Sequence, residues 1–216
     1  SVASDKVHIV GIGDDGLEGM TAQALKVLES AEVLIGPEIC RSLLTKELAG
    51  RLDVAATLDD LCARIEVAGR KRLVVLASGD PLFYGTARYV CSKLGKDRVE
   101  VVPHVSSMQL AFARVKESWE EAYLANVSGQ PIERVIEKVR SSDTVGLFTS
   151  EDWPPTRVAE ALLDSGIDSF QAYVCENLGS PDERVTQGGL RDIAHDSFGP
   201  LNVMILVRKS RITDAA

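Results

Sequence analysis

A glycine-aspartate-proline turn is the first feature of this 216-residue sequence whose residue types could do chemistry. Residues 76–85 read LASGDPLFYG, so an apolar run ends at Ala77 and is followed by Ser78, Gly79, Asp80 and Pro81. Glycine lets the backbone approach a ligand, a carboxylate accepts from hydroxyls or binds a cation, and proline fixes the turn. Taken alone, such a turn is ordinary loop chemistry, so its position in the fold decides its meaning.

An earlier loop, GIGDDG at residues 11–16, matches the dinucleotide-binding fingerprint, and Glu38 lies near where a ribose-binding acid is expected. In that fingerprint the glycines open a helix whose N-terminus faces the pyrophosphate. Here the expected helix begins only at its N-cap, Thr21, and the two aspartates of the loop would repel a pyrophosphate. The loop fits a cation or an uncharged part of a ligand better, so a nicotinamide-binding module is the less favoured interpretation.

Alternating apolar runs and helical patterns must position these loops. Because the β-branched runs do not alternate with polar residues, they indicate a mostly parallel sheet that is covered on both faces. Open parallel sheets bind ligands at the carboxyl ends of their strands, where the glycine-aspartate-proline turn falls. The strands expected in the first half cover residues 7–12, 31–37 (AEVLIGP, ended by its glycine and proline), 52–55, 72–77 and 99–103, and the helices residues 21–31, 39–48, 58–68 and 84–95.

The second half begins where the periodicity breaks, in KESWEEAYLANVSGQP after Val115. We therefore expect two α/β domains, residues 1–116 and 117–216, with a ligand cleft between them. Polar, hairpin-like stretches such as CENLGSPDERVTQGGL predict a mixed second sheet. The strands expected there cover residues 122–127, 144–148, 171–174 and 201–207, and the helices residues 132–140 and 155–165.

Composition counts against several functional classes. The net charge of −8 counts against nonspecific binding to nucleic acid. No apolar run approaches the roughly 20 residues of a membrane span, so a cytoplasmic protein is expected. Four dispersed cysteines without a CxxC pair, and three scattered histidines, predict neither a disulfide framework nor a metal site.

Several of these segments together resemble a known family. VHIVGIG at the start, ASGDPLFYG after the fourth strand and VVPHVSSMQLAFAR after the fifth are similar to the tetrapyrrole (corrin/porphyrin) methylases. With VCENLGSPDERV and FGPLNVMILVR, they look most like the subfamily of precorrin-6Y and cobalt-precorrin-7 C5-methyltransferases. The resemblance runs from about residue 7 to residue 207.

The resemblance implies a two-domain methyltransferase, a homodimer, that binds S-adenosylmethionine in its cleft and methylates C5 of a precorrin or cobalt-precorrin in cobalamin biosynthesis. Backbone groups near Gly79 and the two serine hydroxyls would then hold the methionine and ribose ends, while Phe83 and Leu201 would enclose adenine. The positions that match the family's cofactor loops are Asp14, Gly79, Asp80, Phe83, Ser106, Ser107, Thr149, Tyr173 and Leu201.

Methyl transfer to an electron-rich tetrapyrrole carbon mainly requires positioning, so the sequence assigns no catalytic residue. Tyr84, Asp80, His104 and Glu176 are the polar candidates to test. Family members often carry a C15-methylating decarboxylase, fused or separate, and this chain is expected to supply only the C5 activity.

One segment departs from the family's pattern. Ser128 and Gln130 stand where the subfamily tends to carry a basic His-Gly-Arg-Pro-like segment, which bears on how substrate carboxylates are bound. Other acceptors of the same fold therefore stay open: another tetrapyrrole carbon, a diphthamide precursor or ribosomal RNA. The basic residues that could replace the lost charge are Arg41, Arg88, Arg114 and Arg134.

Overall fold

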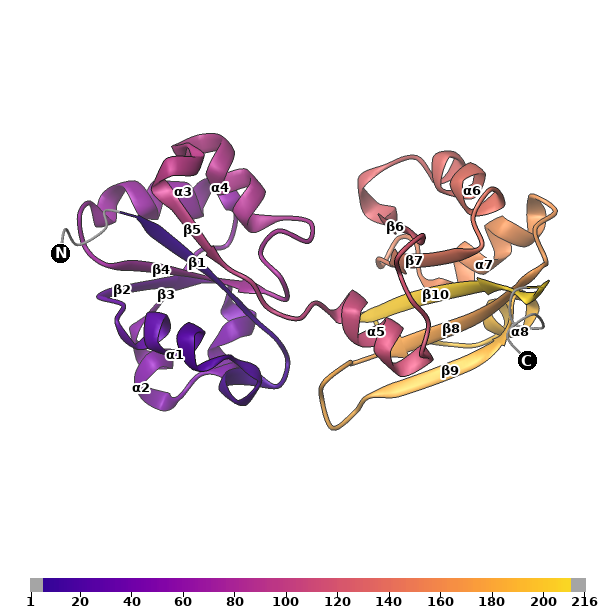
Figure 1. The fold of residues 1–216 in the computed structure, drawn as a ribbon, viewed down its shortest axis with the longest axis horizontal. Coiled ribbons are helices and arrows are strands. Elements are labelled where there is room, and N and C mark those ends of the chain that lie inside the picture. The colour runs from indigo at the N-terminus through magenta and orange to yellow at the C-terminus, as the bar shows by residue number, and fades with distance from the viewer. Residues whose placement is uncertain (1–5, 211–216) are drawn as a thin grey trace. The chain divides into compact units, whose positions relative to one another are not determined.

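The chain forms two compact α/β units that divide between Ser106 and Ser107 (Figure 1). The computed structural model describes residues 6–210. Helix α5 (Ser107–Val115), which the sequence places in the first domain, belongs to the second unit. The cause is direct packing, because a Cβ at Gly146 in the second sheet would lie 2.6 Å from Met108 Sδ of this helix. The division into domains 1–116 and 117–216 stays a prediction.

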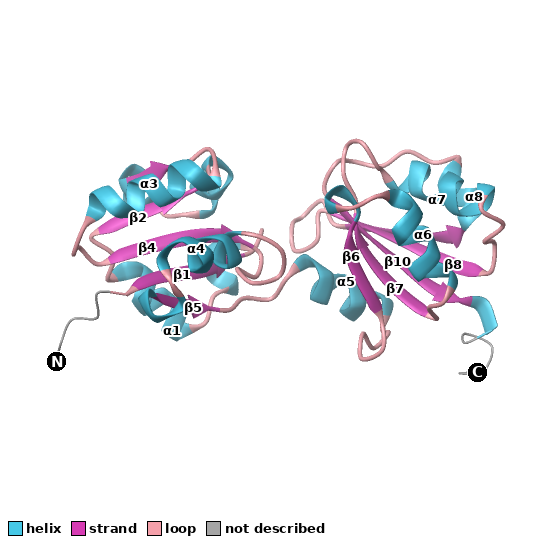
Figure 2. Ribbon diagram, turned by 90° about the horizontal axis from the view of Figure 1, so that it is seen from above, coloured by secondary structure: helices cyan, strands magenta, loops and turns pink. Residues whose placement is uncertain are grey.

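The first unit is built on a parallel sheet, as the sequence predicts. Its strand order is β3-β2-β4-β1-β5, and Figure 2 shows β2, β4, β1 and β5 side by side. All of its strand pairs are parallel. The strands are β1 (Val7–Ile12), β2 (Val33–Gly36), β3 (Leu52–Val54), β4 (Leu73–Ser78) and β5 (Val99–Val102).

Helices cover both faces of this sheet. On one face, Val10 and Leu76 pack against Leu28 of α1. On the other, Ile9 and Val75 pack against α3 and α4. Successive strand residues therefore alternate between two apolar cores, which is why the strands carry apolar runs without polar alternation. The helices are α1 (Ala22–Glu29), α2 (Lys46–Arg51), α3 (Leu58–Ala68) and α4 (Thr86–Leu94).

Threonine caps set where three of these helices begin. The Oγ1 atoms of Thr21, Thr45 and Thr57 accept hydrogen bonds from backbone N–H groups in the first turns of α1, α2 and α3. The expected continuous helix over residues 39–48 is wrong: a 3₁₀ helix covers Glu38–Leu43, and α2 starts afresh after Thr45.

The second unit contains a mixed sheet with the order β6-β7-β10-β8-β9, as the sequence predicts. β6 and β7 pair in parallel and the other pairs are antiparallel. CENLGSPDERVTQGGL spans the turn of the β8–β9 hairpin. The strands are β6 (Tyr123–Asn126), β7 (Thr144–Phe148), β8 (Phe170–Glu176), β9 (Arg184–Gly189) and β10 (Asn202–Arg208).

Helices also lie on both faces of the second sheet. The larger core includes Val145, Phe170 and Met204. It is completed by three helices, α6 (Ile132–Arg140), α7 (Pro155–Asp164) and α8 (Leu190–Ala194). Helix α5 covers the opposite face at Gly146. Within residues 6–210, no helix combines the length and the apolar character that crossing a bilayer requires.

Arg208, at the end of β10, joins three segments of the second unit. Its guanidinium donates to Asp143 at 3.1 Å, to Ser169 at 2.9 Å, and to the carbonyls of Arg140 and Ser142 at 3.0 and 2.7 Å. We expect Arg208→Ala to destabilise this unit by about 2 kcal/mol, because several charge-assisted bonds are lost together. Urea unfolding followed by tryptophan fluorescence measures it.

The matched control for that variant is Arg191→Ala. Arg191 makes an ion pair with Asp168 at 3.4 Å, but its side chain is 78% exposed. Exposed pairs contribute about 0–1 kcal/mol, so this control should unfold nearly as the unchanged chain does. Equal losses in the two variants would contradict the role given to Arg208.

Candidate functional site

Three loops meet at the carboxyl edge of the first sheet. β1 lies between β4 and β5, so the loops that follow these strands are neighbours. The Gly79 N–H donates to the Ile12 carbonyl at 2.8 Å, which extends the pairing of β1 with β4 into the glycine-aspartate-proline turn. This turn therefore occupies the position that the sequence predicts, at the ligand-binding edge of a parallel sheet.

Gly11 allows the three loops to approach one another closely. A Cβ at this position would lie 2.4 Å from the Gly79 carbonyl oxygen, 2.6 Å from His104 Cβ and 2.9 Å from Pro81 Cδ. The glycine is thus required by packing. The first glycine of the apparent dinucleotide fingerprint therefore has a structural explanation that involves no nucleotide.

The same loop is unsuited to a pyrophosphate. Helix α1 begins at Ala22, and a short 3₁₀ helix, Gly16–Gly19, separates it from the glycines. Asp14, a predicted cofactor contact, is exposed in this loop. The late start of the helix agrees with the argument from the sequence against a nicotinamide cofactor.

Asp80 connects two of the three loops. Its Oδ1 accepts from the Leu82 N–H at 2.9 Å and its Oδ2 accepts from the His104 N–H at 3.2 Å. Each carboxylate oxygen therefore accepts from a backbone donor. These contacts make Asp80 a residue that fixes the turn and sets its distance from the loop after β5. That Asp80 also accepts from the ligand stays a prediction.

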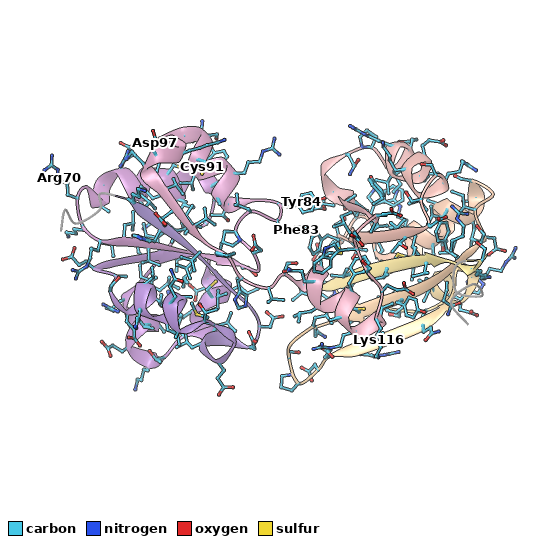
Figure 3. The ribbon with its side chains drawn as sticks, in the orientation of Figure 1. Arg70, Phe83, Tyr84, Cys91, Asp97 and Lys116 are labelled. Carbon is cyan, nitrogen blue, oxygen red and sulfur yellow. The ribbon has the colours of Figure 1, made fainter. Side chains whose placement is uncertain are left out.

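The outer part of the turn presents aromatic and apolar groups. Phe83 is half-buried, and its ring meets that of Tyr84 edge-on, with centroids 5.1 Å apart (Figure 3). Tyr84 has φ = 61°, which is unfavourable for a bulky residue. Gly79 (φ = +73°) and Gly85 (φ = +134°) have open space where a Cβ would lie. A ligand can therefore approach the backbone on both sides of Asp80.

The two predicted serines straddle the boundary between the units. Ser106 is buried at the end of the loop after β5, and half-buried Ser107 begins α5. His104, in the same loop, is half-buried, and its imidazole lies beside Gly13, where a Cβ would be 2.9 Å from Nε2. His104 thus belongs to the edge formed by Gly79 and Asp80.

A second polar group lies at one edge of the second sheet. Strands β6, β7 and β8 end at this edge and β10 begins there, as the pairing directions require. Thr149, the predicted contact after β7, donates to Asn202 Oδ1, and Asn202 pairs with Glu176 across the ladder. Sequence reasoning missed Asn202, although the segment FGPLNVMILVR contains it.

Tyr173 and Leu201 are placed differently from Thr149. Tyr173 lies three residues before Glu176 on β8, so their side chains point to opposite faces of the sheet. Burial raises the pKa of Tyr173, and the Glu117 carboxylate adds to the shift. Leu201 precedes β10 and is 56% exposed. The structure therefore brings Thr149 close to Asn202 but leaves Tyr173 on the other side of its strand.

The segment that departs from the family's pattern forms the turn between β6 and α6. Ser128 is exposed, and its N–H donates to Asn126 Oδ1 at 3.0 Å. Gln130 donates from Nε2 to the Asn126 carbonyl at 3.3 Å. Both residues thus stabilise the turn itself, and neither supplies a positive charge.

The four candidate arginines differ in their environments. Arg41 donates to Glu38 and to the Ala49 carbonyl. Arg114 binds Glu183 through two hydrogen bonds, of 2.8 and 3.1 Å. Arg88 and Arg134 are exposed near the starts of α4 and α6, so they are the better candidates to meet substrate carboxylates.

The Arg114–Glu183 pair gives the second unit a pH-dependent contact. Hydrogen bonds from Arg114 above all, and from the Gly179 N–H, hold the pKa of Glu183 below its usual 4.5. Because the folded pKa lies below the unfolded one, this contact stabilises the fold above about pH 4.5 and is lost as the pH falls through the folded pKa.

We expect Glu183→Gln to lower the melting temperature at neutral pH and to have a smaller effect as the pH falls through the lowered pKa of Glu183 and its carboxyl group becomes protonated. Thermal unfolding of both chains across this range measures the difference. A difference that stays constant with pH would contradict the assignment.

No metal centre is apparent in the described part of the chain, where no three His, Cys, Asp or Glu side chains gather as ligands. Burial raises the pKa of the Cys40 thiol to about 11 and that of the Cys175 thiol to about 12, so neither is a thiolate near neutral pH.

Comparison with known proteins identifies the family. Residues 6–194 match the family model of the Tetrapyrrole (Corrin/Porphyrin) Methylases. The chain therefore belongs to the tetrapyrrole methylases, as its motifs indicate.

Two relatives show which members it is similar to. One is a precorrin-6Y C(5,15)-methyltransferase [decarboxylating] from Sinorhizobium sp, 30% identical over 94% of this chain. This chain spans only 49% of that relative. The other is a probable cobalt-precorrin-7 C(5)-methyltransferase from Methanocaldococcus jannaschii, 28% identical over 92% of this chain and 96% of the relative.

Solved structures share the fold. The precorrin-6Y methylase of Archaeoglobus fulgidus superposes with a TM-score of 0.74 at 20% identity, covering 96% of this chain and 99% of the other. A uroporphyrin-III C-methyltransferase from Thermus thermophilus, solved with S-adenosyl homocysteine, gives 0.72 at 21% identity, with coverage of 96% and 99%. At these identities the likeness establishes the architecture.

Proposed function

We propose that this chain is an S-adenosylmethionine-dependent methyltransferase that methylates C5 of precorrin-6Y or cobalt-precorrin-7 in cobalamin biosynthesis. The proposal rests on the similarity of this chain to two relatives of different length. The longer is named for reactions at C5 and C15, the one of similar length for C5 alone, and this chain aligns with both over more than nine-tenths of its length. C5 is the position that the two names share.

The carboxyl edge of the first sheet has the features that a methyl donor requires. Open space at Gly79 and Gly85 admits a ligand to the backbone, and Asp80 holds the turn in a fixed shape. We propose that backbone groups around Gly79 and the hydroxyls of Ser106 and Ser107 bind the methionine and ribose ends, and that Phe83 contacts adenine. Asp14, Thr149, Tyr173 and Leu201 complete the proposed cofactor contacts.

Bound S-adenosylmethionine supplies an electrophilic methyl group on a sulfonium sulfur. The acceptor carbon of a reduced tetrapyrrole is nucleophilic by conjugation with ring nitrogen, so the chain has to hold the two reactants in line. Tyr84 and His104 lie in the loops at the carboxyl edge of the first sheet. We propose them as the groups to test for removal of the proton that leaves after methyl transfer.

A precorrin carries many carboxylates, whereas this chain has a net charge of −8. A locally positive surface is therefore needed for substrate binding. We propose that Arg88 and Arg134 supply it, because Arg41 and Arg114 are held by carboxylates of the chain itself. The proposal extends to a cytoplasmic homodimer, with C15 methylation and decarboxylation left to a separate or fused partner.

Calorimetric titration tests the cofactor assignment. S-adenosylmethionine and S-adenosylhomocysteine should each bind with a stoichiometry near one per chain, and NADH should give no heat of binding. If neither sulfur compound binds, or if NADH binds instead, the assignment is wrong.

A further inference from the structure

The short turn before β10, residues 199–202, is held by a polar network at the edge of the second sheet. The Gly199 N–H donates to Glu176 Oε1 at 2.8 Å, and the Gly199 carbonyl accepts from Asn202 Nδ2 at 2.7 Å. Both polar groups of one glycine are therefore bound by side chains. Thr149 completes the network by donating to Asn202 Oδ1.

Glu176 is the buried part of this network. Its side chain is 9% exposed, and its second oxygen lies 3.9 Å from the Nε of Arg184, a side chain that is 62% exposed. A carboxylate so deeply buried is costly unless its partners satisfy it. The bond to Gly199 is short, so Glu176 provides a rigid anchor for the turn.

Backbone contacts fix the middle of the same turn. The Asn177 N–H donates to the Leu201 carbonyl at 3.2 Å, and Asn177 has φ = 51°, a conformation that asparagine tolerates better than most residues do. Three hydrogen bonds thus hold the turn, two at Gly199 and one at the Leu201 carbonyl. The apolar side chain of Leu201 is nevertheless 56% exposed. An exposed leucine on a firmly held turn is a preorganised apolar surface.

We infer that Glu176 and Asn202 are positioning residues for the methyl donor. They hold the turn so that Leu201 offers its side chain to the apolar face of the adenine ring, and neither needs to touch the donor. The inference rests on the proposed function. Ordering the turn before binding removes an entropic cost, so loosening it should weaken donor affinity without changing the chemistry of transfer.

Three variants separate this role from direct binding. Glu176→Ala removes the acceptor of the Gly199 N–H and should weaken S-adenosylhomocysteine about tenfold. Glu176→Gln keeps an oxygen that can accept that N–H, so it should retain most of the affinity. A carboxylate that bound the donor's ammonium or ribose directly would lose as much affinity in the glutamine variant as in the alanine variant.

Asn202→Ala removes the donor to the Gly199 carbonyl and should weaken S-adenosylhomocysteine binding to a similar extent. Because both residues act through one turn, the double variant Glu176→Ala, Asn202→Ala should be little weaker than either single variant, which a double-mutant cycle reports. In steady-state assays, KM for S-adenosylmethionine should rise while kcat stays within about twofold.

The matched control is Asp192→Ala. Asp192 Oδ2 accepts from the Gly189 N–H at 3.0 Å, so the lost bond is of the same kind, but it lies where β9 ends rather than where it begins. This variant should lose stability and keep its affinity. The inference is overturned if Glu176→Ala binds S-adenosylhomocysteine as tightly as the unchanged chain does. It is also overturned if the two losses of affinity add up in the double variant, or if Asp192→Ala loses as much affinity as Glu176→Ala.

Failure of the inference and failure of the proposed function give different results. If the unchanged chain binds no S-adenosylhomocysteine, the proposed function has failed. If the unchanged chain binds it and the Glu176 and Asn202 variants bind equally well, only the positioning role is wrong.

Discussion

Gly11→Ala is expected to disrupt the first unit and to abolish donor binding. The added methyl group would lie 2.4 Å from the Gly79 carbonyl oxygen and 2.6 Å from His104 Cβ. The first is a backbone atom, and the second is attached directly to one, so neither can move without displacing its loop. Overpacking of this kind costs about 1–3 kcal/mol in well-packed cores, and we expect the upper end of this range.

Hydrogen exchange measured by mass spectrometry checks this result. Peptides from β1 and β4 should lose protection in Gly11→Ala, while those from the second sheet should keep theirs. Gly50→Ala is the control, because Gly50 lies in α2 and a Cβ there meets nothing within 4 Å. This control should be neutral or stabilising by up to about 1 kcal/mol. Unchanged protection of β1 in Gly11→Ala would show that the loops do not meet as described.

Asp80→Ala should reduce donor affinity by at least about tenfold and destabilise the first unit by about 2 kcal/mol. The variant removes the acceptors of both the Leu82 and the His104 N–H groups, so the turn loses its shape and its link to the loop after β5. Calorimetry with S-adenosylhomocysteine and thermal unfolding measure the two effects. Donor affinity equal to that of the unchanged chain would contradict the role given to Asp80.

Asp60→Ala is the matched control for that variant. Asp60 also bonds a backbone N–H, that of Ala56 at 3.2 Å, and it adds a bond to Arg64 at 3.1 Å, but it belongs to α3 and not to the donor edge. We expect a loss of stability without a loss of donor affinity. The comparison separates a general loss of stability from a local loss of shape.

The architecture could be predicted from local patterns. Apolar runs without polar alternation, such as LVVLA at the start of Leu73–Ser78, indicated a sheet buried on both faces, and the polar stretch after Cys175 indicated a hairpin. The helix expected over residues 39–48 was wrong, because Thr45 caps the start of a new helix instead of continuing the preceding one. Apolar periodicity does not show whether a helix continues through such a residue or starts again there.

The position of the glycine-aspartate-proline turn at the edge of the first sheet was predictable from the sequence. The hydrogen-bond partners of individual side chains were not. The glycine-aspartate-proline turn was predicted to follow the fourth strand, so its place at the carboxyl edge of a parallel sheet was expected. Asp80 accepts from the N–H of His104, 24 residues away. Glu176 accepts from the N–H of Gly199, 23 residues away. Both contacts depend on the geometry of the loops between the partners. Such contacts form only when the whole sheet has assembled, so no local pattern in the sequence announces them.

We expect this chain to transfer a methyl group to C5 of a precorrin. The most direct measurement incubates it with S-adenosylmethionine carrying a ¹³C-labelled methyl group and, in parallel, with metal-free precorrin-6Y and with cobalt-precorrin-7, and locates the label by NMR. The account predicts one new labelled methyl group, bonded to C5, with at least one of the two substrates. A label at any other carbon, or no transfer to either substrate by a chain that binds the donor, would contradict it.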